Sequence, residues 1–182
     1  MQLSRDSITD TALGILAEFG LADVSMRRIA SSLGVAPGAL YWHVESKQEL
    51  VAWMAEAILA PLLAAPPADP AELSEQLRIC VLEVRDGAEV VVAAISQPNS
   101  GVGAGLDGAF QAAVAASSPK GASTSDLRAA ARGLLHLTLG GTAVQQSGAQ
   151  LASATGAGGP VDAGELAADH SRAVALLLSG LE

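Results

Sequence analysis

Residues 37–47 combine side chains suited to contact with a nucleic acid. Tyr41 and His43 end in polar groups that can hydrogen-bond to phosphate. Lys47 adds a cation, and in the first turn of a helix the free backbone N–H groups around it would favour a phosphate too. The small residues at 37–39 would let the backbone approach DNA and meet thymine methyl groups in the major groove. This chemistry predicts double-stranded DNA as a partner.

The elements that would position these groups have the spacing of a helix-turn-helix. Ser25 is a good N-cap for a short helix, Gly34 supplies the turn, and a third helix begins at Pro37 and runs to about residue 43. Leu40 would anchor that third helix in the core. Spacing alone leaves a second interpretation open, in which the aromatic residues simply pack inside a three-helix unit that does not bind DNA. The DNA-contact candidates are Ser25, Arg27, Pro37, Gly38, Ala39, Tyr41, Trp42, His43 and Lys47.

Helical spacing recurs along the rest of the chain, and strand signals are almost absent. Apolar residues predict a first helix over residues 8–19, which Gly20 would end in a left-handed conformation. Ser46 and Glu49 form a capping-box pattern that opens a helix to about residue 62. A proline-rich linker at 64–70 follows, and Asp69 caps the next helix. Residues 88–95 fit a buried strand or a buried helix, and the helical context favours the helix.

The remaining segments complete an all-α prediction. We expect a loop at 97–101, a helix from about Leu106 to 116, a loop at 117–121 and a long helix over 123–146. Residues 148–160 are small and glycine-rich, which predicts a mobile loop. Asp162 caps a last helix that ends at Gly180. That helix is expected to bury Leu166, Val174, Leu177 and Leu178.

The helix-turn-helix segment strongly resembles the N-terminal domain of the TetR family of bacterial transcription factors. The resemblance covers about residues 4–60 and includes the Leu-Tyr-Trp-His-Val segment at 40–44, followed by Lys47. It implies a DNA-binding domain over residues 1–47 and a helical effector-binding and dimerisation domain over 48–182. It also implies a repressor that binds a palindromic operator as a homodimer and is released by a small molecule. Arg27 matches a family arginine that reaches a guanine or a phosphate.

The base-reading positions differ from those of the tetracycline-responsive members. Residues 37–39, Pro-Gly-Ala, offer no amide or hydroxyl to a base edge, so Arg27 becomes the main candidate for direct readout. For Trp42, a contact with the DNA backbone and a role in packing within the protein fit the sequence equally well. The operator sequence therefore does not follow from the resemblance.

A weaker resemblance to the tetracycline-repressor branch continues in residues 85–88 and 135–141. It implies dimerisation through a four-helix bundle built from the 123–146 helix and the last helix. The branch holds its drug as a magnesium chelate through a histidine, where this chain has Val91, and a threonine, where it has Ala94. Residues 59–65 also lack the drug-binding histidine. We therefore expect neither a magnesium–tetracycline site nor another metal or cofactor.

The expected effector site is instead a largely apolar pocket with few polar groups. The polar candidates are Gln97, Asn99 and His136. For each of them, a position in a loop or a hydrogen-bonded position in the interior is commoner than a ligand contact. Effector binding would shift the helix of residues 46–64, which joins the pocket to the DNA-binding unit. The pocket candidates are Trp53, Ile58, Leu62, Val91, Ile95, Gln97, Asn99, Phe110, Leu135 and His136.

Composition excludes several other classes of protein. A net charge of −9 over 182 residues argues against bulk coating of nucleic acid, although residues 24–48 hold three basic residues and one acidic residue. The scattered histidines and the single Cys80 make no catalytic or zinc-binding pattern, and Cys80 reads as a small core residue. No apolar run reaches the length of a membrane span and no signal peptide is visible, so we expect a cytoplasmic protein without membrane contact. A constitutive DNA-binding or interaction protein without an effector is the alternative.

Overall fold

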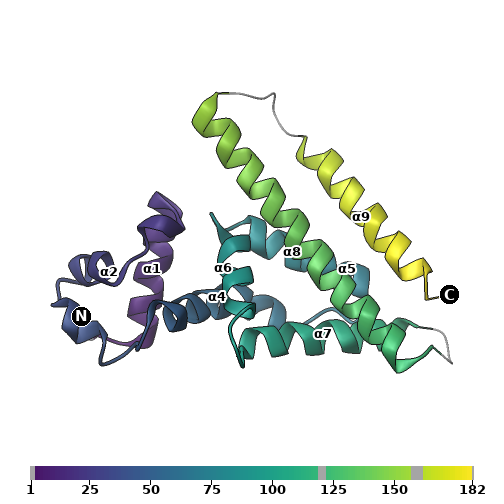
Figure 1. The fold of residues 1–182 in the computed structure, drawn as a ribbon, viewed down its shortest axis with the longest axis horizontal. Helices are drawn as coiled ribbons and strands as arrows, with labels where there is room; N and C mark the ends of the chain where they lie inside the picture. Colours follow the sequence, from purple (N-terminus) through teal and green to yellow (C-terminus); the bar gives the residue numbers. More distant parts are fainter. Residues whose placement is uncertain (1–2, 119–121, 157–161, 182) are drawn as a thin grey trace.

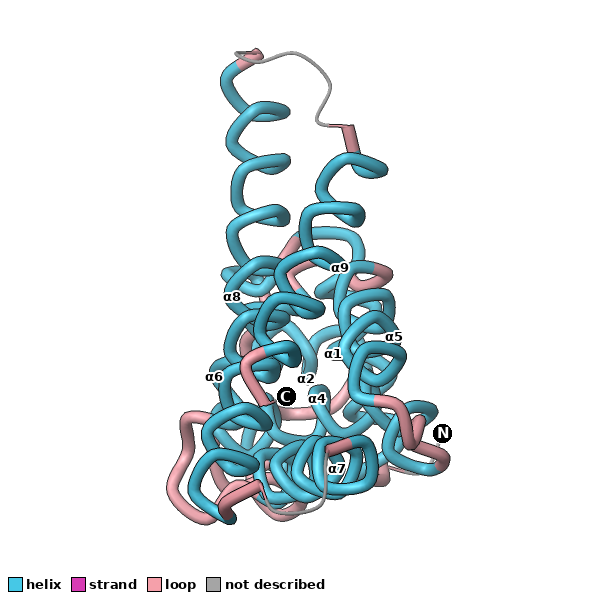
Figure 2. The backbone as a smooth tube through the Cα atoms, turned by 90° about the vertical axis from the view of Figure 1, so that its right-hand side faces the viewer, coloured by secondary structure: helices cyan, strands magenta, loops and turns pink. Residues whose placement is uncertain are grey.

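The computed structural model describes residues 3–118, 122–156 and 162–181. Within these ranges every regular element is helical, which confirms the all-α prediction (Figure 2). The elements are α1 (Arg5–Phe19), the short 3₁₀ turn η1 (Leu21–Asp23), α2 (Met26–Leu33), α3 (Pro37–Leu40), α4 (Lys47–Ala64), α5 (Pro70–Leu82), α6 (Gly87–Ile95), α7 (Gly101–Ser117), α8 (Thr124–Thr155) and α9 (Ala163–Ser179).

The helices form two parts joined by α4. Residues 3–46, with α1 to α3, make a small unit at one end of the molecule, which we call the head (Figure 1). Residues 65–181, with α5 to α9, make a larger unit, which we call the body. Helix α4 packs against α1 of the head and against α5, α6 and α7 of the body. A displacement of α4 therefore acts on both parts.

Aliphatic side chains fill the core of both parts. In the head, Ile8, Leu16 and Leu40 are fully buried, and in the body Leu77, Phe110 and others are. Burial of this much apolar surface is the main favourable contribution to folding. Small residues such as Ala30 let α2 approach its neighbours closely. The core thus orients the head helices without using the exposed side chains of α3.

The helix starts predicted from local sequence are confirmed. The side chains of Ser25, Ser46, Asp69 and Asp162 each accept a hydrogen bond from a backbone N–H of the first helical turn. These caps satisfy N–H groups that have no partner within the helix. Residues 88–95 are helical, as favoured, and lie within α6. The linker before Asp69 is also confirmed, because α4 ends at Ala64.

Several predicted boundaries were wrong. The regular part of α3 ends at Leu40, and residues 41–43 form a turn, in which the N–H of His43 donates to Leu40 at 2.8 Å. Gly20 has a φ of 88° but an extended ψ of 172°, so it is not left-handed helical. Helix α7 begins at Gly101 rather than near residue 106, because Ser100 caps it by accepting from the N–H of Gly103.

The glycine-rich segment after α8 was also predicted wrongly. Residues 148–155 continue α8 instead of forming a loop, and Gly156 ends the helix with a left-handed backbone. The side chain of Gln150 donates a hydrogen bond to Asp86, so a tertiary contact stabilises this helical extension. Residues 157–160 of the predicted loop, and 119–121 of the previous one, lie outside the described residues.

Helix α9 is less buried than predicted. Val174 is buried, whereas Leu166, Leu177 and Leu178 keep part of their surface exposed. Helices α8 and α9 run antiparallel, side by side, and extend beyond the other helices (Figures 1 and 2). Their outer side is not covered by any other described element.

Candidate DNA-binding surface and effector cavity

The turn between α2 and α3 has the geometry that the helix-turn-helix spacing predicts. Gly34 adopts a left-handed backbone, with φ 68° and ψ 28°, which glycine adopts without strain. Directly after it, the N–H of Val35 donates to the carbonyl of Ala30 at 3.0 Å. The side chain of Ser25 accepts from the N–H of Arg28 at the start of α2. Local hydrogen bonds therefore define where α3 begins.

The aromatic side chains after α3 lie at the surface. Trp42 is 90% exposed and Tyr41 is 55% exposed, while His43 is also exposed. The interpretation in which these residues pack inside the head does not hold, because the head core is filled by other side chains. An exposed tryptophan beside other exposed rings is typical of a contact surface. Pro37 and Gly38 are exposed and Ala39 is half-buried on the same short segment.

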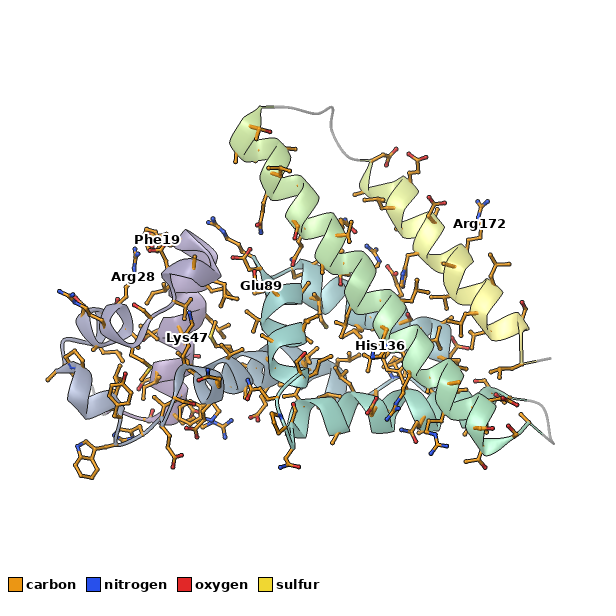
Figure 3. All side chains as sticks on the ribbon, in the orientation of Figure 1. Phe19, Arg28, Lys47, Glu89, His136 and Arg172 are labelled. Atoms are coloured by element: carbon orange, nitrogen blue, oxygen red, sulfur yellow. The ribbon has the colours of Figure 1, made fainter. Side chains whose placement is uncertain are left out.

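The two arginines of α2 have different environments. Arg28 forms an ion pair with Asp23, and its guanidinium lies 3.7 Å from the centre of the Phe19 ring (Figure 3). Arg27 is exposed and makes no hydrogen bond or ion pair within the described residues. Arg28 is therefore engaged in joining α2 to the end of α1. Arg27 is available for a ligand.

Lys47 begins α4 at the edge of the head. Ser46 caps the helix through the N–H of Glu49 at 3.1 Å. The Glu49 carboxylate accepts from the N–H of Glu45 at 2.7 Å, and not from that of Ser46 as the capping-box pattern predicted. Lys47 is exposed and has no ion-pair partner among the described residues. Its ammonium and the first N–H groups of α4 form a site where a phosphate is favoured.

The head is joined to the body by polar contacts at the start of α6, which the sequence analysis did not anticipate. Arg85 donates to the carbonyl of Glu18 at 2.8 Å, and Asp86 accepts from the N–H of Leu21 at 2.7 Å. Asp86 also accepts from Gln150 of α8. The only sign of this junction in the sequence was the charged segment at residues 85–87 between two apolar helices. The residues that bind Arg85 and Asp86 lie more than 60 positions away in the chain.

Gln146 supports the same junction from α8. Its amide nitrogen donates to the carbonyls of Val81 and Val84, and its amide oxygen accepts from the N–H of Ala88 at 3.0 Å. One side chain thereby satisfies backbone groups at the end of α5 and at the start of α6. The turn at residues 83–87 is consequently held against α8.

The residues predicted to line an apolar effector pocket do not gather around one space. Leu62, Val91, Phe110 and Leu135 are buried core residues, and Ile95 is half-buried against them. Trp53 is half-buried on α4, with the Arg5 guanidinium 4.9 Å from its ring centre. The three polar candidates are also separated: Asn99 is an exposed loop residue, His136 is exposed on α8 (Figure 3), and Gln97 donates to the carbonyl of Gln48 at 2.9 Å.

A cavity of about 480 Å³ lies at the junction between head and body. Lys47, at the start of α4, and Glu89, of α6, both line this cavity, and Figure 3 labels the two side chains. Its volume is within the usual range for small-molecule sites, and such sites often lie between domains. The lining mixes polar with small apolar groups: Leu21, Ala22, Lys47, Gln48, Val51, Asp86, Glu89, Ala93, Gln97 and Gln150. Of the predicted pocket residues, Gln97 is in this lining. Ile58 instead lines a different cavity of about 420 Å³, beside Cys80.

A buried chain of hydrogen bonds connects α9 to α5 and α8. Thr138 donates to the carbonyl of Leu134 at 2.8 Å, so its oxygen accepts from the Ser74 hydroxyl. Ser74 then has no proton left, and it must accept from Nε2–H of His170 at 3.3 Å. Burial lowers the pKa of His170, an effect that Glu75 opposes and Arg78 reinforces. The neutral ring, protonated at Nε2, is the form that suits this site.

Three further features of the described residues concern nucleophilic chemistry, metal binding and membrane insertion. Burial, together with Glu83, raises the pKa of the Cys80 thiol, which makes it less nucleophilic. Among the described residues, no group of three or more His, Cys, Asp or Glu side chains could hold a metal ion. None of the described helices is both long and apolar enough to span a membrane.

Comparison with known proteins identifies the family. The profile of bacterial regulatory proteins of the tetR family matches residues 8–54. The crystal structure of Mycobacterium smegmatis BioQ is 33% identical, with a TM-score of 0.84, and the match covers 99% of this chain and 98% of that one. The chain belongs to the tetR family. This agrees with the resemblance seen over about residues 4–60.

Other relatives within the tetR family cover the chain to different extents. A crystal structure of BioQ with its double-stranded DNA operator is 32% identical, with a TM-score of 0.75, and covers 99% of this chain and 98% of that one. The class D tetracycline repressor of Escherichia coli is 41% identical over 59 residues, which are 32% of this chain. That match spans only 27% of the tetracycline repressor's own length.

Proposed function

We propose that this tetR-family chain is a DNA-binding transcriptional regulator whose head contacts double-stranded operator DNA. The observation that carries the proposal is Trp42, which is 90% exposed in the turn after α3, beside the exposed Tyr41. A large apolar ring on the surface is costly in water unless a partner covers it. The likeness to BioQ, which has been crystallised with its operator, supports DNA as that partner.

The contacts divide by chemistry into two groups. Tyr41, His43 and Lys47 would hydrogen-bond to phosphates and set the orientation of the head, and Trp42 would pack against the DNA backbone. Pro37, Gly38 and Ala39 would lie against base edges and provide only apolar contact. Arg27, which has no partner in the described residues, would supply direct readout. Ser25 would contribute through its position at the start of α2.

We further propose that the regulator is a homodimeric repressor with a DNA-binding domain over residues 1–47 and an effector-binding and dimerisation domain over 48–182. Helix α4 begins at Lys47, where this division falls. Two heads related by two-fold symmetry would enter successive major grooves of a palindrome, about 34–36 Å apart. The uncovered outer side of α8 and α9 provides the surface for the second copy.

The effector part of the proposal rests on the junction cavity. A ligand held between Lys47 and Glu89 would contact head and body together, so its binding would depend on their relative position. This changes the expected effector chemistry from largely apolar to one with polar or charged groups. The predicted apolar pocket residues are mostly core side chains, and their role as ligand contacts gains no support from their positions.

The decisive experiment is selection of bound genomic fragments by the purified chain, followed by footprinting of the recovered sites. A footprint on a palindromic sequence is expected, and Trp42→Ala should lose affinity for it while keeping the unfolding transition of the wild type. Trp42→Phe is the matched control that retains a ring. Recovery of no preferred fragment, or unchanged affinity for Trp42→Ala, would contradict the proposal.

The alternative is a constitutive regulator without an effector, and a ligand screen separates the two. Compounds that raise the unfolding temperature are tested for release of the selected fragment. Effector control predicts a compound that does both and whose effect is lost in Glu89→Ala. A stabilising compound that never alters DNA affinity would favour the constitutive alternative.

A further inference from the structure

Two neighbouring cavities share part of their lining. The junction cavity of about 480 Å³ and a smaller one of about 220 Å³, between α6 and α8, are both lined by Asp86, Glu89 and Gln150. The two spaces therefore meet at these side chains. Together they form one elongated site that runs from the start of α4, past α6, to α8, and we call this site the α6 groove.

Charged side chains of opposite sign line the α6 groove without pairing. Lys47 and Glu89, both labelled in Figure 3, are exposed, and neither has an ion-pair partner among the described residues. The Asp86 carboxylate accepts hydrogen bonds from uncharged groups, the N–H of Leu21 and the amide of Gln150. These bonds orient the carboxylate and leave its charge unbalanced. The groove thus offers one cation to an anionic group and two carboxylates to a cationic group.

The charges have a definite order along the groove. Lys47 lines the larger cavity alone, whereas the two carboxylates line both cavities. Beyond the carboxylates, the smaller cavity has apolar walls from Ala88, Val92 and Ala143. The amide of Gln146, which also lines it, is already hydrogen-bonded to backbone groups of the turn between α5 and α6. A ligand that fits this order carries an anionic group, then a cationic group, then an apolar part.

We propose that the α6 groove binds an α-amino acid with an apolar side chain. The ligand's carboxylate lies against Lys47, its ammonium lies against Asp86 and Glu89, and its side chain contacts the apolar walls beyond them. The three groups of an α-amino acid diverge from one carbon, so they can reach the three parts of the lining together. A few placed polar groups that orient a ligand, beside apolar walls that bury the rest of it, are typical of small-molecule sites.

The same binding withdraws Lys47 from DNA. The inference rests on the proposed function, in which Lys47 contacts a phosphate, and it gives the effector of that function a chemical class. A ligand carboxylate and a DNA phosphate compete for one ammonium group. Each therefore lowers the protein's affinity for the other by the same factor. Release of the operator then follows from the loss of a phosphate contact, in addition to any movement of the head.

Matched compounds test the ligand class: norleucine, its isomer ε-aminocaproate, hexanoate and pentylamine. The isomer has the atoms and charges of norleucine, but its ammonium is at the far end of the chain. Hexanoate is norleucine without the ammonium, and pentylamine is norleucine without the carboxylate. Calorimetry with the full chain, free of DNA, should give norleucine a Kd about fivefold lower than that of each other compound. Equal affinities for norleucine and its isomer, or no binding of norleucine, would overturn the proposed ligand.

Variants assign the two charged groups of the ligand to their protein partners. Lys47→Gln should abolish the preference for norleucine over pentylamine, and Glu89→Gln should reduce the preference for norleucine over hexanoate. Glu83→Gln is the matched control, because this exposed acid lines a different cavity, and it should bind norleucine as the wild type does. Circular dichroism verifies that each variant keeps its helical content. Preferences that persist in both Lys47→Gln and Glu89→Gln would overturn the α6 groove as the site.

A separate measurement tests the competition with DNA. Fluorescence anisotropy gives the affinity for the selected genomic fragment with and without saturating norleucine, which should lower it about fivefold and reduce the salt slope by about 1. In Lys47→Gln, norleucine should change neither quantity. An unchanged DNA affinity of the wild type would overturn the competition. A wild type that binds no fragment would instead overturn the proposed function, while the calorimetric ranking of the compounds is read without DNA.

Discussion

The carboxylate of Asp86, at the start of α6, accepts a hydrogen bond from the backbone N–H of Leu21, the first residue of η1, over 2.7 Å. Asp86 holds a left-handed backbone with φ 55°, and Gly20 approaches it so closely that an added Cβ would be 2.9 Å from its oxygen. The hydrogen bond from Leu21 to Asp86 thus connects head and body. It lies between two positions, Gly20 and Asp86, whose positive φ few residue types adopt readily. The adjoining cavity is lined by the same two residues, Leu21 and Asp86.

Loss of the Asp86 carboxylate should loosen the head. Asp86→Ala removes the acceptor for Leu21 and strains the positive φ, so the free energy of unfolding should fall by about 1–3 kcal/mol. Asp86→Asn should lose less, because its amide oxygen still accepts and asparagine tolerates this backbone. Urea unfolding measures the stability, and hydrogen exchange of residues 18–24 locates the change. Equal losses for the two variants would show that the Leu21 contact contributes little.

Lys47 should contribute to DNA affinity through its charge. Lys47→Ala should weaken binding to all DNA sequences alike and reduce the slope of log K against log salt by about 1. Lys47→Arg retains the charge and should keep the slope. Fluorescence anisotropy over a salt series gives both quantities. An unchanged slope for Lys47→Ala would exclude a phosphate contact.

The two arginines of α2 should behave in opposite ways. Arg27→Ala should cost about 1–3 kcal/mol of affinity on the selected operator and much less on scrambled DNA, with no loss of stability. Arg28→Ala removes the Asp23 pair and the Phe19 contact, so its main effect should be a lower unfolding temperature. Binding assays on both DNAs and thermal unfolding separate these effects. Equal losses of Arg27→Ala on both DNAs would make it a backbone contact.

His170 should make stability fall on acidification. Burial lowers its pKa below the ordinary 6.5, so the unfolded chain binds the proton more readily than the folded one. The free energy of unfolding should therefore decrease as the pH falls through 6.5 towards the folded pKa, and stay constant above that window. His170→Gln keeps a donor for Ser74 and should lose this dependence. Urea unfolding at several pH values tests it, and a slope that survives in His170→Gln would assign it to other groups.

Gly87 should not tolerate a side chain. A Cβ there would lie 2.4 Å from the carbonyl oxygen of Val81, so Gly87→Ala should destabilise the protein by about 1–3 kcal/mol. Gly108→Ala is the control, because nothing lies near its added Cβ and alanine favours the helix by up to about 1 kcal/mol. Thermal unfolding of both variants should show shifts of opposite sign. A Gly87→Ala protein as stable as the wild type would mean that the turn can move.

Local sequence predicted the features that depend on neighbouring residues. Ser25, Ser46 and Asp69 begin helices because a side-chain oxygen reaches a backbone N–H within one turn, an interaction visible in the sequence. Gly34 likewise marks the turn before α3, because only a left-handed residue fits there. Residue types and spacing likewise predicted residues 37–47 as a segment that contacts DNA. The exposure of Tyr41 and Trp42 in that segment agrees with a contact surface.

Tertiary structure decided what depends on residues far apart in the chain. The hydrogen bond from Gln150 to Asp86 supports the extension of α8 through residues predicted as a loop. This extension was not predicted because Asp86 lies 64 positions earlier in the chain. Most of the apolar residues expected around a ligand lie in the core, since periodicity shows that a side chain is buried but not what it packs against. The acidic chain with a small basic segment was apparent from composition alone. That one side of α8 and α9 faces solvent follows from how these helices pack against the rest of the body, which the spacing of apolar residues within each helix does not determine.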